Sequence, residues 1–536
     1  MKTTELKTLE ILKEAKVSWW KPLLFLFGIS ITIFGVLRVI DFLLYYYQIE
    51  IFSGVFSELD ILANTLGGLG EVVTGVLGIE ITVIAIIVQL AANKYSSKIM
   101  DLFVENRVNF LVIAIFVVTA INAVLVTNTL SPNFPTPFSI LTTIILIIVS
   151  LLIVIPHFSY VFNFLRPMNF LGHVKEKVIA EIRGLSSGKI KYSLKVRDEI
   201  NNHINFIGDI ALNSVYQGDR AVTLLCISIL REIVVDYLKF KKKLPEDWFK
   251  LSGLEYFDPD FSSYSSYVMD RIEENKVLVE RKVFGLYELV FNNSRLTLRD
   301  VASGVLLNSE LISIAAIKAN DKGALYTSFQ YFNSYLRIAI RGKDPRSAFN
   351  TLEHYRIVAE ELITTFPEEV EKLEFYFKYY GQEANKNQIL FILETAAHDL
   401  CRLNEVAYEK RAPNLKTLLE LFLTLDEPLD ESNASDKNSK EQSLIGVRIA
   451  QVKLAGFYLI YNEVELARRI FEDLRVEPAD RIQKIKEIIF NTTQEEFWEI
   501  TPRGINFYYV SKRRRDALKQ FFAWFEQSSE STIKGM

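Results

Sequence analysis

The side chains best suited to chemistry are titratable or charged groups inside long apolar segments. They are Arg38 and Asp41, Glu71 and Glu80, and His157. Ionisable groups at membrane depth usually face a cavity or one another, and they mark routes for ions or protons. These residues therefore predict ion or proton chemistry, provided that the segments around them cross a membrane.

Small and polar residues recur at alternating spacings of four and three in the apolar stretch 64–96. They are Asn64, Gly68, Glu71, Gly75, Gly78, Thr82, Ala85, Gln89, Ala92 and Ser96. The first eight, as far as Gln89, are the candidate pathway-lining residues, and we call these eight the stripe. On an α-helix this spacing gives one face that drifts by roughly 20° per seven residues. Glu80 follows Glu71 by nine residues, about half a turn around the helix. It therefore lies opposite the stripe and needs a separate partner.

Two interpretations of the stripe remain open. Small residues let helix backbones approach closely, so the stripe could be a packing seam between helices. Alternatively, its polar members could line a water-filled path for ions, so that they are the pathway-lining residues. Both hold if copies of this helix surround a common axis.

The charged residues need partners, because an acidic side chain at the centre of a membrane helix costs about 2.5 to 3.5 kcal/mol on insertion scales. Arg38 could pair with Glu71, since both lie toward the same side of the membrane. A local pair of Arg38 with Asp41, three residues further on, is the alternative. His157 could titrate a proton or act as a satisfied interhelical donor.

Four apolar segments are long enough to position these residues across a membrane. They span residues 22–46, 64–92, 110–130 and 138–162. Trp19 and Trp20 precede the first segment and Tyr45 to Tyr47 close it, as expected of an aromatic belt at the two membrane surfaces. Pro156 predicts a kink near the end of the fourth segment.

Basic residues predict the orientation of these spans. Those that flank the spans are Lys2, Lys7, Lys13, Lys16 and Lys21, then Lys94, Lys98 and Arg107, then Arg166, Lys175 and Lys177. The segments 48–60 and 131–137 contain none. Cytoplasmic loops carry the excess of lysine and arginine. We therefore expect a multi-pass membrane protein with both termini in the cytoplasm.

The remainder of the chain predicts an all-α fold with a large cytosolic domain of stacked antiparallel helices, because its apolar residues recur with helical periodicity. The expected regions are a cytosolic N-terminal helix (1–21), a transmembrane domain (22–165), a helical domain (170–425), a disordered acidic loop (426–443) and a helical subdomain (444–536). Residues 511–525 combine a run of four basic residues, 512–515, with four aromatic ones. They could contact a membrane surface, or they could begin a solvated helix with a buried aromatic face.

The composition favours a protein that is not an enzyme. No Walker, kinase or zinc-protease motif occurs, and the five histidines are dispersed. Cys226 and Cys401 are the two cysteines, too few for a disulfide framework or a cysteine-based metal site. We expect no catalytic residues, metal or cofactor. The net charge of -4 also argues against nucleic acid as a partner.

Two stretches resemble a widespread bacterial family of uncharacterised predicted membrane proteins, a domain of unknown function. In residues 81–126 the matching positions are Gln89, Leu90, Ala91, Ser97, Lys98, Leu102, Phe103, Arg107 and Val108. In residues 204–225 they are Asp209, Ile210, Ala211, Leu212, Ser214 and Asp219, whereas the family's turn prolines are absent. The resemblance implies the membrane architecture and supplies no catalytic residues.

The leading functional hypothesis is a homo-oligomeric channel or pore for inorganic ions. The second span would line the pathway, and the helical domain would be a cytosolic scaffold or gate. The alternatives are a non-conducting, membrane-anchored interaction or signalling scaffold and a secondary transporter. The sequence names no cytosolic partner.

Overall fold

The computed structural model describes residues 20–49, 59–104, 106–131, 134, 136–251, 261–426, 437–501 and 503–534. Helices dominate these residues, and the extended structure among them consists of two isolated bridges, Ser131 with Phe134 and Glu496 with Ile505. The chain divides into two compact units, residues 1–170 and 171–536. The predicted N-terminal helix, residues 1–21, lies outside the described residues except for its last two.

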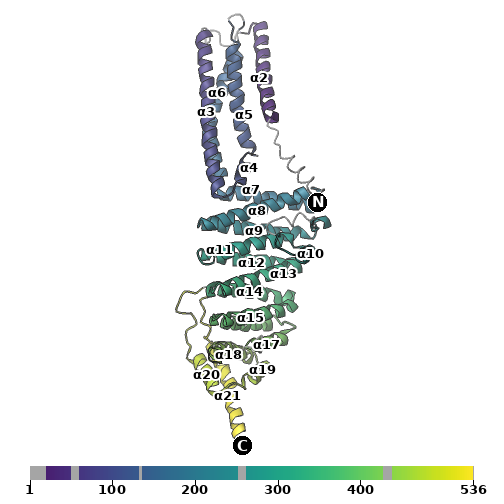
Figure 1. Cartoon of the computed structure of the whole chain (residues 1–536), viewed down its shortest axis with the longest axis vertical. Coiled ribbons are helices and arrows are strands. Elements are labelled where there is room, and N and C mark those ends of the chain that lie inside the picture. The colour runs from purple at the N-terminus through teal and green to yellow at the C-terminus, as the bar shows by residue number, and fades with distance from the viewer. Residues whose placement is uncertain are drawn as a thin grey trace. The chain divides into compact units, whose positions relative to one another are not determined.

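Unit 1 contains the long apolar helices. They are α2 (Trp20–Tyr46), α3 (Leu59–Lys94), α5 (Arg107–Asn128) and α6 (Pro137–Phe164), and a short helix α4 (Lys98–Val104) lies between α3 and α5 (Figure 1). Helices α2, α3 and α6 contain the predicted spans 22–46, 64–92 and 138–162, whereas α5 begins three residues before the predicted span 110–130 and ends two residues short of it. Helix α6 continues through Pro156, whose missing N–H leaves one helical carbonyl without its usual donor.

A fifth helix, α12 (Arg299–Ala319) in unit 2, is also long and apolar enough to cross a membrane. In its most apolar window 61% of the residues are buried inside the protein, against 17 to 39% for the four helices of unit 1. Its Glu310 carboxylate contacts the Nδ1 atom of His354 at 2.6 Å. Length and hydropathy alone therefore do not distinguish α12 from the helices of unit 1.

Apolar side chains fill the interior of the unit 1 bundle. Val73, Val112, Phe116 and Ile147 form one buried cluster, contributed by α3, α5 and α6. Further clusters join Leu66 with Val126 and Ile140, and Ile84 with Val88 and Val161. The polar groups described below lie between these clusters.

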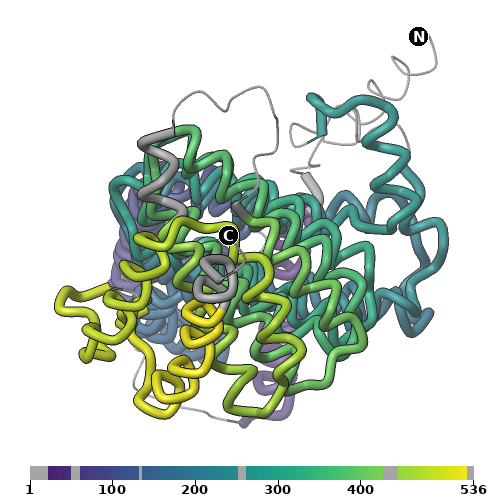
Figure 2. Tube along the Cα trace, turned by 90° about the horizontal axis from the view of Figure 1, so that it is seen from below, coloured from purple at the N-terminus to yellow at the C-terminus, as the bar shows by residue number. Residues whose placement is uncertain are grey.

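Unit 2 is a stack of helices. They are α7 (Pro167–Ser186, which begins in unit 1), α8 (Leu194–Tyr216), α9 (Arg220–Lys241), α10 (Ser266–Glu274), α11 (Leu278–Ser294), α12, α13 (Lys322–Arg341), α14 (Pro345–Thr365), α15 (Pro367–Lys386), α16 (Leu390–Glu409), α17 (Leu415–Leu423), α18 (Lys437–Ile460), α19 (Val464–Leu474), α20 (Ala479–Asn491) and α21 (Lys512–Lys534), with short 3₁₀ turns at Glu246–Trp248 and Thr424–Asp426. Helices α9, α12, α14, α16 and α18 pack in succession, and α11, α13 and α15 form the neighbouring row. Figures 1 and 2 show this succession from two directions.

A repeated turn separates successive helices of unit 2. Gly218, Asn320 and Lys343 adopt left-handed backbone conformations, and each is followed by an aspartate. Those aspartates cap α9, α13 and α14 by accepting hydrogen bonds from backbone N–H groups. Asp219, part of the family-like stretch, is one of them. Its role in this structure is therefore to start a helix.

The structure describes only the two ends of the predicted acidic loop, residues 426–443. Residues 427–436 of the predicted loop lie outside the described residues, but α18 begins at Lys437, so residues 437–443 are helical and that end of the prediction was wrong.

In α21, Phe521, Phe522 and Trp524 are buried. Their burial agrees with a solvated helix that has a buried aromatic face, and it leaves these rings no part in a membrane contact.

Candidate functional site in the helices of unit 1

The stripe occupies the outward face of α3. All eight of its residues are exposed, from Asn64 at one end to Gln89 at the other. A Cβ atom built on Gly68, Gly75 or Gly78 would have no other atom within 4 Å. Among the described residues of one copy, therefore, these three stripe glycines make no close contact with another helix.

A different set of small residues packs α3 against α5. A Cβ on Gly70 would lie 3.1 Å from the side chain of Ala123, and one on Gly67 would lie 3.9 Å from Thr127. Thr74 satisfies its hydroxyl by donating to the carbonyl of Gly70 at 2.9 Å. The seam inside the bundle consequently lies beside the stripe, and it accounts for the close approach of α3 and α5.

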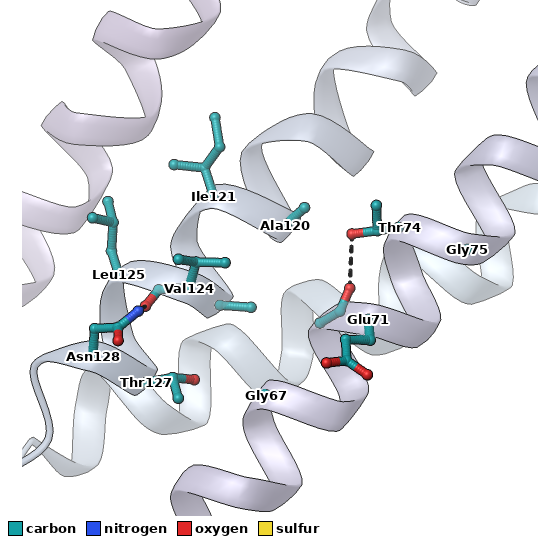
Figure 3. Close-up of a pocket in the computed structure, with 12 residues that line it drawn as sticks. Gly67, Glu71, Thr74, Gly75, Ala120, Ile121, Val124, Leu125, Thr127 and Asn128 are labelled. Carbon is teal, nitrogen blue, oxygen red and sulfur yellow. Dashed lines mark hydrogen bonds between the residues drawn. The ribbon is translucent and has the colours of Figure 1, made fainter.

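A groove of about 680 Å³ follows the junction of α3 and α5. Figure 3 shows Gly67, Glu71, Thr74 and Gly75 on the α3 side and residues from Ala120 to Asn128 on the α5 side. Glu71 is therefore both a member of the stripe and part of the groove wall. Its exposed carboxylate is available to a partner outside the bundle.

Glu80 belongs to a buried polar network that crosses three helices. Its Oε1 atom lies 2.6 Å from Nδ1 of His157, and Nε2 of His157 lies 3.2 Å from Oδ1 of Asn109. The amide Nδ2 of Asn109 donates to the carbonyl of Phe103 at 2.7 Å. Glu80, His157 and Asn109 are each less than 5% exposed. This arrangement supplies the separate partner that the position of Glu80 requires.

The hydrogen bonds fix how many protons the network holds. Because the Asn109 amide donates to a carbonyl, its oxygen faces the imidazole, and that oxygen can only accept. Nε2 of His157 must therefore carry a proton. One further proton lies between Nδ1 of His157 and Glu80, either as an imidazolium facing a carboxylate or as an imidazole facing a carboxylic acid. Both forms have zero net charge, which lowers the cost of burial in an apolar bundle.

The network lies toward the end of the bundle at which α5 begins and α6 ends. From the sequence, a hydrocarbon core of roughly 20 residues placed at 72–91 predicts Glu80 near mid-depth. In the structure its partners are in the first turn of α5 and in the last turns of α6, beside the connection through α4. Sequence reasoning missed Asn109, although an asparagine just inside an apolar segment was a usable signal. The second oxygen of Glu80, Oε2, has no hydrogen-bond partner among the described residues.

Asp41 and Arg38 have partners other than those predicted. The buried Asp41 carboxylate accepts from the backbone N–H groups of Phe138 and Ser139, at 2.9 and 3.2 Å, and from the Ser139 hydroxyl. It thus neutralises the positive N-terminal end of α6. Arg38 donates to the carbonyl of Thr129 at 2.8 Å and lies over the Phe34 ring. In the described part of unit 1 neither Glu71 nor Asp41 forms a salt bridge with Arg38, although the charge of Asp41 still acts on Arg38.

Hydroxyl groups complete the polar interior. Thr119 on α5 and Ser150 on α6 are buried and hydrogen-bonded to each other at 2.9 Å. Thr143 donates to the carbonyl of Ser139 one turn earlier. Among the described residues no group of three histidine, cysteine, aspartate or glutamate side chains is close enough to hold a metal ion. The chemistry that this interior can perform is therefore proton sharing at Glu80 and His157.

Comparison with known proteins identifies the N-terminal part of the chain. No curated protein and no solved structure matches it. The second family-like stretch, which starts at residue 204, lies almost wholly beyond the region that a family match covers. Residues 16–205, with all four long helices of unit 1, match a family described as Predicted membrane protein (DUF2254), whose function is unknown, and this confirms the resemblance for that part of the chain.

Proposed function

We propose that this membrane protein is a homo-oligomeric, non-enzymatic channel or pore for inorganic ions. In this proposal the stripe of α3 faces other copies of the chain and the pathway between them, and unit 2 is a cytosolic scaffold or gate. One observation carries the proposal. The eight stripe residues are exposed, whereas the opposite face of the same helix packs against α5 and α6.

The composition of the exposed face argues against lipid as its sole neighbour. Glu71, Asn64 and Gln89 would each lose hydrogen bonds in hydrocarbon, and a charged carboxylate at the helix centre costs about 2.5 to 3.5 kcal/mol on insertion scales. Contact with water or with a second copy removes that cost. The open space beside Gly75 and Gly78 would let another helix approach closely.

The packed interior of the bundle favours a path between copies over a path through one copy. Val73, Phe116 and Ile147 are almost completely buried and lie in one cluster between the helices. A route through a single bundle would have to displace these side chains. A route along the stripe needs no such rearrangement, and Glu71 would there form an acidic ring that favours cations.

The proposal includes a topology of four spans with both termini in the cytoplasm. The basic residues at the ends of the spans support this orientation. Helix α12 would not be a span, because it packs against four neighbouring helices and because its Glu310 pairs with His354. A cysteine-accessibility assay on intact spheroplasts tests this directly. Exposure of a residue in 48–60 on the outside supports the topology, and exposure of the α12 ends on opposite sides overturns it.

Disulfide cross-linking tests the assembly. The native cysteines should form no intermolecular disulfides in this assay. Cys226 and Cys401 are buried, and burial raises the pKa of the Cys401 thiol to about 12. We expect Gly75→Cys and Gly78→Cys to form cross-linked dimers on oxidation, since disulfides need Cα atoms within about 7 Å. Val83→Cys, exposed on α3 about 140° around the helix from Gly78, is the matched control. Equal cross-linking of all three variants would contradict an ordered contact at the stripe.

Conductance tests the pathway. Purified protein in planar bilayers should conduct cations. Glu71→Gln should reduce the cation preference, and Gly75→Leu should reduce conductance by filling the space beside the stripe. Val83→Leu, exposed on another side of α3, should leave both unchanged. Unchanged selectivity and conductance in both stripe variants would contradict the pore assignment.

A non-conducting scaffold is the second candidate, and the stacked helices of unit 2 favour it, because such stacks commonly present extended binding surfaces. Cross-linking at the stripe without ion flux would select this alternative. A secondary transporter would instead show substrate-coupled flux without steady single-channel conductance.

A further inference from the structure

A second pocket lies in unit 2, far along the chain from the stripe. Its volume is about 580 Å³, which falls in the range typical of small-molecule sites. Helices α14 and α16 contribute Phe349, Phe391 and Glu394, and the rest of the lining comes from the end of α20 and the segment that follows it.

Six of the fourteen residues that line the pocket are aromatic. The centroids of Phe349 and Phe391 are 5.4 Å apart, and Phe507 packs against both of these rings. Phe497 and Trp498 stack on each other at 4.3 Å. Trp498 remains 73% exposed, and Phe391 is exposed as well. Uncovered aromatic faces beside a cavity are typical of a site that is completed by a ligand.

The pocket has an acidic side chain but no basic one. Glu394 is its one carboxylate, and the lining residues include no lysine, arginine or histidine. Burial raises the pKa of Glu394, and its partner in a side-chain hydrogen bond is the neutral Tyr508. Behind it, α18 presents Gly446, where a Cβ would overlap the carboxyl group. The carboxyl group is therefore held at the pocket wall without a positive partner.

The same ring cluster already binds a cation on its other side. The guanidinium of Arg503 lies 4.2 Å from the centroid of Phe349 and 5.8 Å from that of Phe507. Asp399 and Glu353 neutralise this arginine, which does not line the pocket. The cluster is thus built so that aromatic faces meet positive charge.

We infer that this pocket binds an organic cation with an apolar body, of the quaternary ammonium class. The aromatic walls would surround the alkylated nitrogen through cation–π contacts, and Glu394 would supply the counter-charge. The site is independent of the proposed channel, and each could fail without the other.

Calorimetric titration of the full-length protein in detergent tests the inference. The probes are choline and its uncharged carbon analogue 3,3-dimethyl-1-butanol, with benzyltrimethylammonium as a larger cation. We expect choline to bind at least about tenfold more tightly than the uncharged analogue, because the contact with the rings is electrostatic. Benzyltrimethylammonium should bind more tightly than choline, since it fills more of the cavity. Binding of the uncharged analogue as tight as that of choline, or no binding of either cation at millimolar concentration, overturns the inference.

Two variants and a control locate the site. Glu394→Gln keeps the shape of the side chain, and Trp498→Ala removes an exposed ring with little effect on folding. Each should weaken cation binding by about fivefold or more. Tyr216→Ala, which removes an equally exposed ring on α8 outside the pocket, should leave binding unchanged. If both pocket variants bind choline as the unaltered protein does, the cation binds elsewhere and the assignment is wrong.

Discussion

The two units bury charge in different ways. In unit 1, Glu80 faces His157 and shares one proton with it, and Asp41 faces backbone N–H groups. In unit 2, full ion pairs are common. Lys241 lies 2.6 Å from Glu280 and 2.7 Å from Asp321, and all three side chains are largely buried.

The difference follows from the surroundings of each unit. The bundle of unit 1 has an apolar exterior, so a charge that loses its partner has no water within reach. Sharing a proton or using helix N–H groups keeps the interior neutral with few ionised groups. Unit 2 has polar turns and exposed charges around its core, and its buried lysine and arginine residues lie among several carboxylates.

The glycines of the two units differ in how closely other atoms surround them. Gly75 and Gly78 face open space, so their small size serves no contact within one copy. Gly208 and Gly446 are surrounded in unit 2, where a Cβ would overlap Leu286 or Glu394. Packing within one chain explains Gly208 and Gly446. No contact among the described residues explains Gly75 and Gly78.

The largest effect should come from breaking an ion-pair cluster of unit 2. Lys241→Met leaves Glu280 and Asp321 buried beside each other, and we expect a loss of about 3 to 5 kcal/mol in the free energy of unfolding. Lys175→Met removes a partly exposed pair with Glu232 and should cost less than about 1 kcal/mol. Denaturant titration with a fluorescence readout gives both values. Equal losses would show that burial is not what distinguishes the clusters.

The same cluster predicts a pH dependence. Burial alone would lower the pKa of Lys241, but the carboxylates of Glu280 and Asp321 outweigh it and raise that pKa above its ordinary value. A raised pKa in the folded state means that the contribution to stability is complete below the unfolded value of about 10.4. It is lost as the pH rises through the folded value. Unfolding midpoints should therefore fall at strongly alkaline pH in the unaltered protein and change less in Lys241→Met.

An intermediate effect should come from the neutral network of unit 1. His157→Leu leaves Glu80 and Asn109 without their partner, and it should cost about 1 to 3 kcal/mol against unfolding in detergent. Glu80→Gln should cost less than about 1 kcal/mol, because the amide can donate to Nδ1 of a neutral imidazole without changing the net charge. If Glu80→Gln proves as harmful as Glu80→Ala, the pair holds its proton as an imidazolium facing a carboxylate, and the form with a neutral imidazole is wrong.

The smallest effect should come from the stripe glycines. Gly75→Ala meets no atom, so the stability of one copy should change by less than about 1 kcal/mol. Gly446→Ala forces the Glu394 side chain to move and should destabilise unit 2 by about 1 to 3 kcal/mol. Thermal unfolding of monodisperse protein measures both. Strong destabilisation by Gly75→Ala would mean that the stripe supports the stability of the assembly as well as its function.

The sequence alone determined the helical fold, the positions of the four apolar helices and the one-face order of the stripe. Each of these depends on the spacing of apolar residues and on the length of apolar segments. Both are properties of consecutive residues in the sequence. It also placed Glu80 opposite Glu71, because an angle around a helix follows from spacing alone.

Only the tertiary structure decided which residues meet. The partners of Glu80, Asp41 and Arg38 lie on other helices, and a choice among them depends on how the helices turn and slide against each other. The structure also showed that the stripe faces outward and that the internal seam is formed by Gly67 and Gly70. Spacing gives the face on which a residue lies, but packing decides which face of each helix becomes the interior.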